Sequence, residues 1–417
     1  MTDLALIADD LTGAADAGVP FAAAGFTTAI PFDRVRQEAA EVLCLSTDSR
    51  DISVAEAERR VRQALIAIFG RDGAHRTPWI YKKMDSALRG HPAEELLVTM
   101  RLAGITRAIV APAIPSQART TVGGIALDHG IPLAQTPIGQ EHGRDNLARL
   151  FQRSVRVPVR LIDLPTVRGP DRALRNALSL PGSWIAIADA ETEADLDRVA
   201  LTGVAAGVRL FCGAAGLTSV LARRLPIHEV HRPPAVMTSD RPVLVVAGSR
   251  HAVTARQIEV ALAAGAAMVR LDQRTIDDER PELGEYQQQV LAALEAGRTT
   301  IVTTVGLGES PFKGAVVSER LAAAAIRPEV LERIGGLVLT GGDVAAAVCR
   351  ALGVRTIWLR GEVLSAIPWA TLGGGWVDGM PVVTKAGSFG PPDAIQTAIE
   401  FLRVIGRDGR APRPPGA

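Results

Sequence analysis

Charged and hydroxyl side chains follow the apolar runs in the first half of the chain. The segment LALIADDLTGAADAG, residues 4–18, is apolar until Asp9 and Asp10, and an alanine-rich stretch follows. Carboxylates accept hydrogen bonds from hydroxyl groups, whereas Arg and Lys bind carboxylates or phosphates. A site that holds both kinds of group suits a small polyhydroxylated acid. The other members of this set are Arg50, Lys82, Lys83, Asp85, Ser86, Arg89, Arg119 and Asp189.

The second half of the chain presents glycine at the corresponding places. Gly248–Ser249, 306–308, Gly341–Val344 and 385–390 each follow an apolar run. Glycine lets backbone N–H groups approach phosphate oxygens closely, and the N-terminus of a following helix adds a favourable dipole. Several such turns in one half of the chain indicate a site for the phosphates of a nucleotide.

Two common nucleotide-binding motifs are absent from the sequence. The pattern GxxxxGK[ST] does not occur, because Phe312 precedes Lys313 and Thr384 precedes Lys385. This excludes a P-loop protein. The pattern GxGxxG does not open a helix either, since Pro311 stands at the third glycine position after Gly306 and Gly308. A nicotinamide-dependent oxidoreductase is therefore disfavoured.

Apolar strands that alternate with Ala- and Leu-rich helices must carry these residues. The alternation is typical of an α/β fold, and continuous apolar strands indicate parallel sheets with both faces covered. In such sheets ligands bind beyond the carboxyl ends of the strands. The predicted strands are 4–8, 42–46, 79–83, 108–111, 184–188 and 209–212, then 243–247, 267–271, 300–304, 336–339, 356–359 and 382–384, with helices from about residue 252 and at 343–352.

A chain of 417 residues is too long for one ordinary core. The polar, proline-rich stretch IHEVHRPPAVMTSDRP at 227–242 lacks periodicity and indicates a linker. We predict two domains, each a mainly parallel sheet flanked by helices, with the active site in the cleft between them. The predicted boundaries are 1–228 for the N-terminal domain, 229–241 for the linker, 242–405 for the C-terminal domain and 406–417 for a disordered tail.

Composition narrows the class of partner. The net charge is +1, so no overall field attracts nucleic acid or a membrane. The three Cys lie far apart without a CxxC pair, which is typical of reduced core residues in a cytoplasmic protein. The N-terminus has no basic targeting region, and no apolar run approaches the ~20 residues of a membrane span.

Six motifs together resemble the landmarks of the four-carbon acid sugar kinases. This family includes the D-erythronate, D-threonate, L-threonate and 3-oxo-tetronate kinases. The resemblance runs from residue 4 to about residue 405. The motifs are IADDLTGAADAG, YKKMDSALRGHPAEEL, PAIPSQARTTVGG, AGSRHAVTARQI, LTGGDVAAAVCRALG and TKAGSFG.

The resemblance implies an N-terminal domain that binds the sugar acid and a C-terminal domain that binds ATP, the phosphoryl donor. On the acid side, the expected residues are Asp9, Asp10, Arg50, Lys82, Lys83, Asp85, Ser86 and Arg89. On the nucleotide side, they are Ser249, Gly341, Gly342, Asp343, Val344, Lys385 and Gly387.

Several roles stay open at this point. Asp10 or Asp85 is expected to be the base that orients the attacking hydroxyl, and Arg50 or Lys83 to grip the substrate carboxylate. Mg²⁺ is expected to bridge the triphosphate oxygens. Asp343 would hold this ion, directly or through water, unless it only caps the helix that follows. Closure of one domain on the other would then exclude water from the active site and limit hydrolysis of ATP.

Some residues have simpler interpretations. Asp or Ser after a strand is often only a helix N-cap. His91 and His251 lie beside the motifs and most simply have supporting or surface roles. His228 and His231 have zinc-like spacing, but they lack Cys partners, so we expect no metal there.

The chain also departs from the family pattern. Ala87 stands where the family usually has Thr, and Ala118 stands where Gly usually precedes Arg119. The stretch IGQEHGRDNL lacks the usual Asp-Pro, and VLSAIPW replaces the usual PGxP after Glu362. The substrate is therefore either a four-carbon aldonate or 3-oxo acid, or a branched five-carbon oxo-acid such as 3-oxo-isoapionate. A non-catalytic relative is a further alternative, and apolar helices suggest a homodimer.

Overall fold

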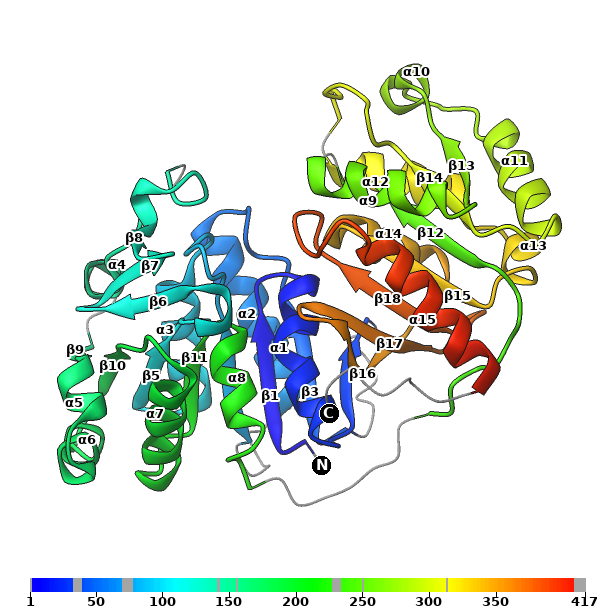
Figure 1. Ribbon diagram of the computed structural model, residues 1–417. Coiled ribbons are helices and arrows are strands. Elements are labelled where there is room, and N and C mark those ends of the chain that lie inside the picture. Colours follow the sequence, from blue (N-terminus) through cyan, green and yellow to red (C-terminus); the bar gives the residue numbers. More distant parts are fainter. Residues whose placement is uncertain are drawn as a thin grey trace. The chain divides into compact units, whose positions relative to one another are not determined.

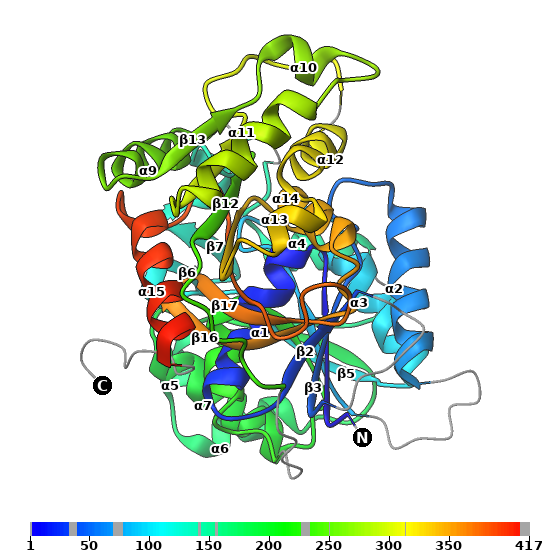
Figure 2. The same cartoon turned by 90° about the vertical axis from the view of Figure 1, so that its right-hand side faces the viewer.

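The computed structural model describes residues 2–32, 40–69, 78–140, 143–154, 157–226, 234–249, 251–312 and 314–408. Contacts within the chain divide it into two compact units, Met1–His231 and Arg232–Ala417, here called unit 1 and unit 2. Both units are α/β structures (Figures 1 and 2). Residues 234–241 of the predicted linker contain neither helix nor strand. Among the described helices, none combines the length and apolar character needed to cross a membrane.

Unit 1 contains a sheet in which neighbouring strands pair in parallel. Apart from β9, its strands are almost entirely buried, which explains why most of them are uninterrupted apolar runs. The strand order is β2 (Thr28–Pro31), β3 (Val42–Ser46), β1 (Leu4–Ala8), β4 (Trp79–Lys83), β11 (Leu210–Gly213), β5 (Arg107–Ala111), β10 (Trp184–Ala188) and β9 (Val159–Ile162).

Helices cover the sheet of unit 1, and a small antiparallel sheet lies beside it. One core cluster joins residues of β1, β4, β5, β10 and β11 to residues of α2, α3 and α4. The helices are α1 (Leu11–Ala23), α2 (Val54–Phe69), α3 (Pro92–Ala103), α4 (Leu147–Ser154), α5 (Leu164–Arg168), α6 (Asp171–Leu178), α7 (Glu193–Ala205) and α8 (Ala215–Leu221). The small sheet comprises β6 (Arg119–Val122), β7 (Ile125–Asp128) and β8 (Ile131–Pro132), with 3₁₀ turns η1 (Pro115–Gln117) and η2 (Leu133–Gln135) beside it.

Unit 2 contains a second sheet that is parallel except at one edge. The order is β13 (Ala267–Arg270), β14 (Thr300–Thr303), β12 (Val243–Ala247), β15 (Gly336–Thr340), β18 (Pro381–Lys385), β17 (Ile367–Gly373) and β16 (Thr356–Leu364). Strand β17 pairs antiparallel with both β16 and β18. The helices are α9 (Ala252–Ala263), α10 (Gln273–Asp277), α11 (Gly284–Glu295), α12 (Gly314–Ala325), α13 (Pro328–Leu331), α14 (Gly342–Ala351) and α15 (Ala394–Asp408).

The predicted α/β class and mainly parallel sheets are confirmed, with some differences in the elements. Each predicted strand occurs, but the sequence pattern did not reveal β2, β9, β17 or the small sheet. Residues 119–121 do not merely follow a strand, as predicted, because they belong to β6. Helix α15 continues to Asp408, so residues 406–408 are helical where a tail was predicted. Residues 409–417 lie outside the described part of the chain. The three Cys are free and buried, as expected.

Candidate active site

The charged residues of unit 1 gather at the carboxyl edge of its sheet. Strand β1 pairs in parallel with β3 and β4, with Ala8 opposite Ser46 and Ile7 opposite Lys82. The segments that follow these three strands therefore leave the sheet at the same edge. They carry Asp9 and Asp10, then Arg50, then Asp85 to Arg89, and Lys83 ends β4 at the same edge.

Arg50 is the centre of this cluster. Its Nε and Nη2 donate to the two oxygens of Asp9 at 2.8 and 3.1 Å, and its Nη1 lies 2.8 Å from Asp10 Oδ2. Asp85 Oδ1 lies 3.8 Å from Nη2. Carboxylates thus face all three guanidinium nitrogens. Arg50 holds the three carboxylates together although their negative charges repel one another.

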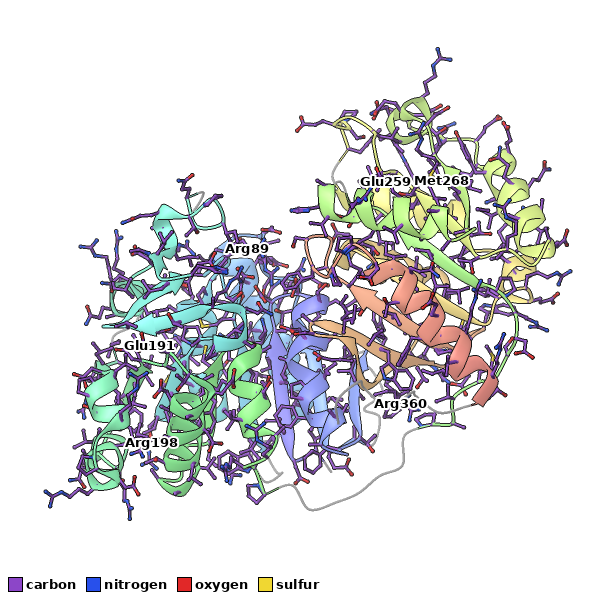
Figure 3. The ribbon with its side chains drawn as sticks, viewed as in Figure 1. Arg89, Glu191, Arg198, Glu259, Met268 and Arg360 are labelled. Carbon is purple, nitrogen blue, oxygen red and sulfur yellow. The ribbon has the colours of Figure 1, made fainter. Side chains whose placement is uncertain are left out.

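Asp85 is held from a second side. Arg89 donates to both of its oxygens from Nε and Nη2, at 2.9 and 3.0 Å, and the backbone N–H of Ala87 donates at 3.1 Å. Figure 3 labels Arg89 at this end of the unit 1 sheet. The next residue, Ser86, accepts a hydrogen bond from Arg119 of β6. The small sheet therefore contributes a third Arg to the edge, after Arg50 and Arg89.

Lys82 and Lys83 are neighbours in β4 and point to opposite faces of the sheet, as successive strand residues must. Lys83 Nζ lies 4.0 Å from Asp16 of α1 and donates to the carbonyl of Met84 at 3.0 Å. Lys82 Nζ lies 2.7 Å from Glu95 Oε2 of α3, and both side chains are 1% exposed. The structure thus gathers Lys83 with the aspartates and places Lys82 in a buried ion pair.

The three aspartates differ in pKa. Burial raises the pKa of Asp9, but the charges of Arg50, Lys82 and Lys83 outweigh it, so the pKa is lowered. Burial also opposes ionisation of Asp85, yet Arg89 and Arg50 hold its pKa well below the usual range. The pKa of Asp10 is raised, chiefly by burial and also by the charge of Asp9, against the influence of Arg50.

Asp10 has a second function in the fold. Its Oδ1 accepts a hydrogen bond from the backbone N–H of Gly13 at 2.6 Å, which caps helix α1. Its side chain is 28% exposed, compared with 5% for Asp9 and 10% for Asp85. Asp10 is therefore the most accessible of the three carboxylates.

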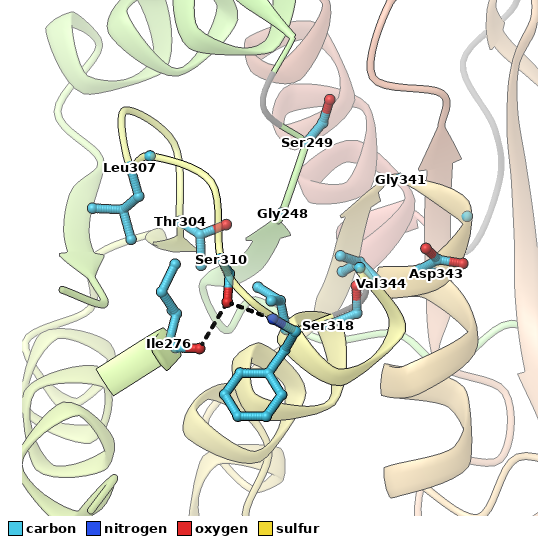
Figure 4. Close-up of a pocket in the computed structure, with 15 residues that line it drawn as sticks. Gly248, Ser249, Ile276, Thr304, Leu307, Ser310, Ser318, Gly341, Asp343 and Val344 are labelled. Carbon is cyan, nitrogen blue, oxygen red and sulfur yellow. Dashed lines mark hydrogen bonds between the residues drawn. The ribbon is translucent and has the colours of Figure 1, made fainter. Parts of the chain in front are cut away.

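Unit 2 contains a pocket of about 240 Å³ at the carboxyl edge of its own sheet (Figure 4). Five of the predicted nucleotide-side residues line it, namely Ser249, Gly341, Gly342, Asp343 and Val344. The turn after β15 needs glycine, since Gly341 has φ +102°. Gly342 then begins helix α14, whose first N–H groups lack partners within the helix and suit an anion.

Lys385 and Gly387 lie at the end of β18 and on the loop that follows it. Lys385 is 2% exposed, and its Nζ donates to the carbonyl of Ala386 at 2.9 Å. Burial lowers the pKa of this amine to about 8. A Cβ on Gly387 would overlap the side chain of Ser249, so the loop approaches the pocket rim closely. Neither residue is among those that line the pocket.

Asp343 does not cap its helix. Helix α14 begins at Gly342 rather than at residue 343 as predicted, its N-cap residue is Gly341, and Asp343 lies in the first turn. No group of three or more His, Cys, Asp or Glu side chains with metal-binding geometry occurs among the described residues. Mg²⁺ usually binds through one or two carboxylates together with substrate phosphates. A single carboxylate at this pocket fits an ion that arrives with a nucleotide.

Several contributors escaped the sequence analysis. In unit 1 these are Asp16, Glu95 and Arg144, which donates to the carbonyls of Leu88 and Gly90. In unit 2, α10, the loop after β14 and helix α12 form one wall of the pocket. Ser310 donates to the carbonyl of Ile276 and accepts from the N–H of Phe312 in this wall. In the sequence, only the glycines at 306–308 indicated that this wall belongs to the site. The missed lining residues are Ile276, Thr304, Ser310, Phe312, Gly314, Val317 and Ser318.

The remaining candidate residues have structural contacts. Asp189 accepts from the N–H groups of Gly123 and Gly124 and so holds the turn between β6 and β7. The ring of His91 contacts the carbonyl of Ile52, and His251 accepts from the N–H of Val253 at the start of α9. His228 and His231 lie outside the described residues.

Comparison with known proteins agrees with this arrangement. A model of a sugar-binding N-terminal domain matches residues 4–221, and a model of a nucleotide-binding C-terminal domain matches residues 244–395. The chain is 32% identical to a D-threonate kinase of Salmonella typhimurium, over 96% of this chain and 98% of the relative. It is 31% identical to a D-erythronate kinase of Heliobacterium modesticaldum, over 96% and 97% of the two chains. The chain belongs to the four-carbon acid sugar kinase family.

A solved structure supports the fold alone. A protein from Salmonella typhimurium described as a putative tRNA synthase superposes with a TM-score of 0.78 at 20% identity. The match covers 95% of this chain and 98% of that one.

The departure at Ala118 has a conformational explanation. Ala118 has φ +54°, in the left-handed region where glycine is favoured, and it ends the turn η1. A residue with a Cβ costs roughly 1–2 kcal/mol in this region, against roughly 0.5–1 kcal/mol of extra chain entropy for glycine. The usual glycine would therefore relieve backbone strain at this position.

We expect Ala118→Gly to raise the melting temperature by about 2–4 °C, which corresponds to about 1 kcal/mol. Turnover should not change. Ala206→Gly is the matched control, because Ala206 ends helix α7 with φ −78° and gains nothing from glycine. Differential scanning calorimetry of both variants checks the prediction, and a lower melting temperature for Ala118→Gly would contradict it.

Proposed function

We propose that this protein is an ATP-dependent kinase that phosphorylates a hydroxyl of a small sugar acid. The observation that carries the proposal is the cluster of Asp9, Asp10 and Asp85 around Arg50 at one sheet edge. Family membership and the glycine-lined pocket of unit 2 support it. The acid would be a four-carbon aldonate or 3-oxo acid, such as threonate, erythronate or a 3-oxo-tetronate.

On the acid side, Lys83 is a better partner for the substrate carboxylate than Arg50. Three aspartates already neutralise Arg50, whereas Lys83 has a carboxylate only at 4.0 Å. Ser86 and the half-exposed Arg89 border the same edge and would contact hydroxyls or the carboxylate. Asp9 would act mainly by holding Arg50.

Asp10 is the proposed general base. Of the three aspartates at the edge, it is the most exposed and has the raised pKa, so it accepts a proton most readily. It would accept the hydrogen bond of the attacking hydroxyl and take its proton as the O–P bond forms. Asp85 is less suitable, because Arg89 and Arg50 hold its pKa well below the usual range, so it takes up a proton less readily.

On the nucleotide side, the N-terminus of α14 and the turn Gly248–Ser249 would receive the phosphates. The apolar wall that includes Leu307, Phe312 and Val317 would receive the base. Asp343 would contact Mg²⁺ carried by the triphosphate, which supplies charge neutralisation. The reaction further requires that the acid reach the terminal phosphate, so we infer that the acid and nucleotide domains close on each other during turnover.

The test is ADP release with MgATP across a panel of acids. The panel comprises both erythronates, both threonates, 3-oxo-tetronates and the branched five-carbon 3-oxo-isoapionate. We expect acid-dependent ADP release with one of the four-carbon acids. Fastest turnover of 3-oxo-isoapionate would instead select the five-carbon alternative. Release that does not depend on any acid would contradict the proposal.

Ligand protection separates the remaining alternatives. At a hundred times its dissociation constant a ligand stabilises the folded state by about 2.7 kcal/mol, so ATP with Mg²⁺ should raise the melting temperature. NAD should not. Protection by ATP without turnover of any acid would indicate a non-catalytic relative. A homodimer stays a prediction, to be read from the mass in solution.

A further inference from the structure

A buried polar chain lies beneath the carboxylate cluster of unit 1. Lys82 of β4 pairs with Glu95 Oε2 of α3 at 2.7 Å, and Ser49 donates to Glu95 Oε1 at 2.6 Å. Ser49 Oγ lies 2.7 Å from Thr47 Oγ1, which donates to the carbonyl of Ala8 at 2.9 Å. All four side chains are at most 1% exposed.

This chain joins the elements that carry the site. Ala8 directly precedes Asp9, Ser49 directly precedes Arg50, and Lys82 directly precedes Lys83. The backbone N–H of Ser49 also donates to the carbonyl of Asp9 at 2.8 Å. Movement of Ser49 or Lys82 would therefore move the cations that contact the aspartates.

The turn that presents Arg50 is strained and needs such support. Asp48 has φ +46°, which is unfavourable for a residue with a Cβ. Arg60 of α2 donates to the carbonyl of Asp48 at 2.8 Å from one side, and Glu95 holds Ser49 from the other. The turn is thus held at two successive residues before Arg50.

We propose that Lys82, Glu95 and Ser49 are positioning residues that hold Arg50, and through it the site aspartates, and that Lys82 does not touch the acid. Lys82 and Lys83 leave β4 on opposite faces, and the ammonium group of Lys82 is already paired with Glu95 where both side chains are 1% exposed. A buried ion pair is weak evidence for stability, because apolar replacements are often neutral. The Lys82–Glu95 pair is connected to the segments that carry Asp9, Arg50 and Lys83. This connection indicates that the pair fixes the positions of the site residues.

The inference rests on the proposed function and is tested with four variants. They are Ser49→Ala, Glu95→Gln, Lys82→Met and the double variant Lys82→Met/Glu95→Gln, which removes both charges together. We expect each to lower kcat/KM for the acid at least tenfold and to leave KM for MgATP unchanged. If Lys82 instead bound the acid directly, Lys82→Met alone would raise KM for the acid, and Ser49→Ala and Glu95→Gln would be near wild type.

Two further measurements separate positioning from a purely structural role. The matched control is Arg224→Met/Asp197→Asn, which removes a bidentate pair between α7 and the turn after α8. It should leave kinetics unchanged. Because Lys82 helps to lower the pKa of Asp9, the double variant should raise this pKa. Wild-type kinetics together with a wild-type Asp9 pKa in a folded double variant would overturn the inference.

The carboxyl carbon of Asp9, titrated by NMR in ¹³C-labelled protein, gives a readout without turnover. We expect a higher Asp9 pKa in the double variant than in the wild type. An inactive wild type would count against the proposed function, while this titration would still decide the inference. If the double variant does not fold, Ser49→Ala retains the ion pair and carries the test. An unaltered Asp9 titration together with unaltered kinetics in Ser49→Ala would then refute it.

Discussion

Asp10→Asn should lower kcat for acid phosphorylation by about 10²–10⁴-fold, the usual contribution of a general base. Asn cannot take the proton of the attacking hydroxyl, but its side-chain oxygen can still accept the N–H of Gly13 and cap α1. The fold should therefore persist, and KM for MgATP should not change. Steady-state kinetics with the acid identified from the panel checks the prediction.

Two control variants separate the loss of a base from the loss of a helix cap or of a charge. Asp163 caps helix α5 by accepting from the N–H of Thr166 at 3.0 Å, so Asp163→Asn repeats the same change at a cap outside the cluster. It should be fully active. Asp85→Asn should mainly raise KM for the acid, since Asp85 holds Arg89. If Asp85→Asn abolished turnover while Asp10→Asn kept a large part of it, Asp85 would be the base.

The pH dependence follows from the same carboxyl group. Because the pKa of Asp10 is raised above its ordinary value of 3.8, the base is protonated at a higher pH than a free aspartate. Activity should fall as the pH decreases through this pKa. The acidic limb should be absent from the residual activity of Asp10→Asn.

The strands that could be predicted from the sequence are the buried ones, because burial on both faces requires a run of mostly apolar residues. The strands at 4–8 and 79–83 are buried throughout, so their sequences are mostly apolar and their bounds were correct. Strand β17 was missed because its sequence, IPWATLG, contains Pro368 and Gly373, which usually indicate turns. Pro368 lies near the start of the strand, beside a register irregularity between Glu362 and Leu364 of β16, and Gly373 is its last residue. Strand β9 was missed because two of its four residues are exposed.

The sequence predicted which residues of the candidate site meet at one edge of the sheet. It did not predict which side chains pair with one another there. Residues that follow parallel strands must meet at one edge, which brought Asp9, Arg50 and Asp85 together. The period of two within β4 already assigned Lys82 and Lys83 to opposite faces, but it could not show which of them has a close carboxylate partner. That Glu95 of α3 would neutralise Lys82 depends on helix packing, which no local pattern encodes.

Lys385→Met should weaken MgATP binding about ten- to a hundredfold. Lys385 is buried at the carboxyl edge of the unit 2 sheet, where its backbone pairs with Thr340 of β15. In the described part of the chain no carboxylate contributes to its pKa, which burial alone lowers to about 8. A buried cation of this kind favours an anionic partner, and a hydrogen bond to a charged group contributes roughly 1.5–3 kcal/mol.

The sign of the pH dependence makes this prediction specific. Lys385 is charged below pH 8 and neutral above it, so wild-type affinity for MgATP should fall about tenfold per pH unit above 8. Stability should change in the opposite direction. Between pH 8 and the ordinary pKa of 10.5 the unfolded chain binds the proton and the folded chain does not, so the free energy of unfolding rises with pH.

Isothermal titration calorimetry at pH 7 and pH 9 measures the affinity, and urea unfolding over the same range measures the stability. Lys385→Arg is the matched control, because Arg stays charged at both pH values and should bind MgATP without this pH dependence. Lys385→Met should show neither the loss of affinity above pH 8 nor the gain in stability. An equal pH dependence in wild type and Lys385→Met would mean that another group titrates at the nucleotide site, because Met cannot.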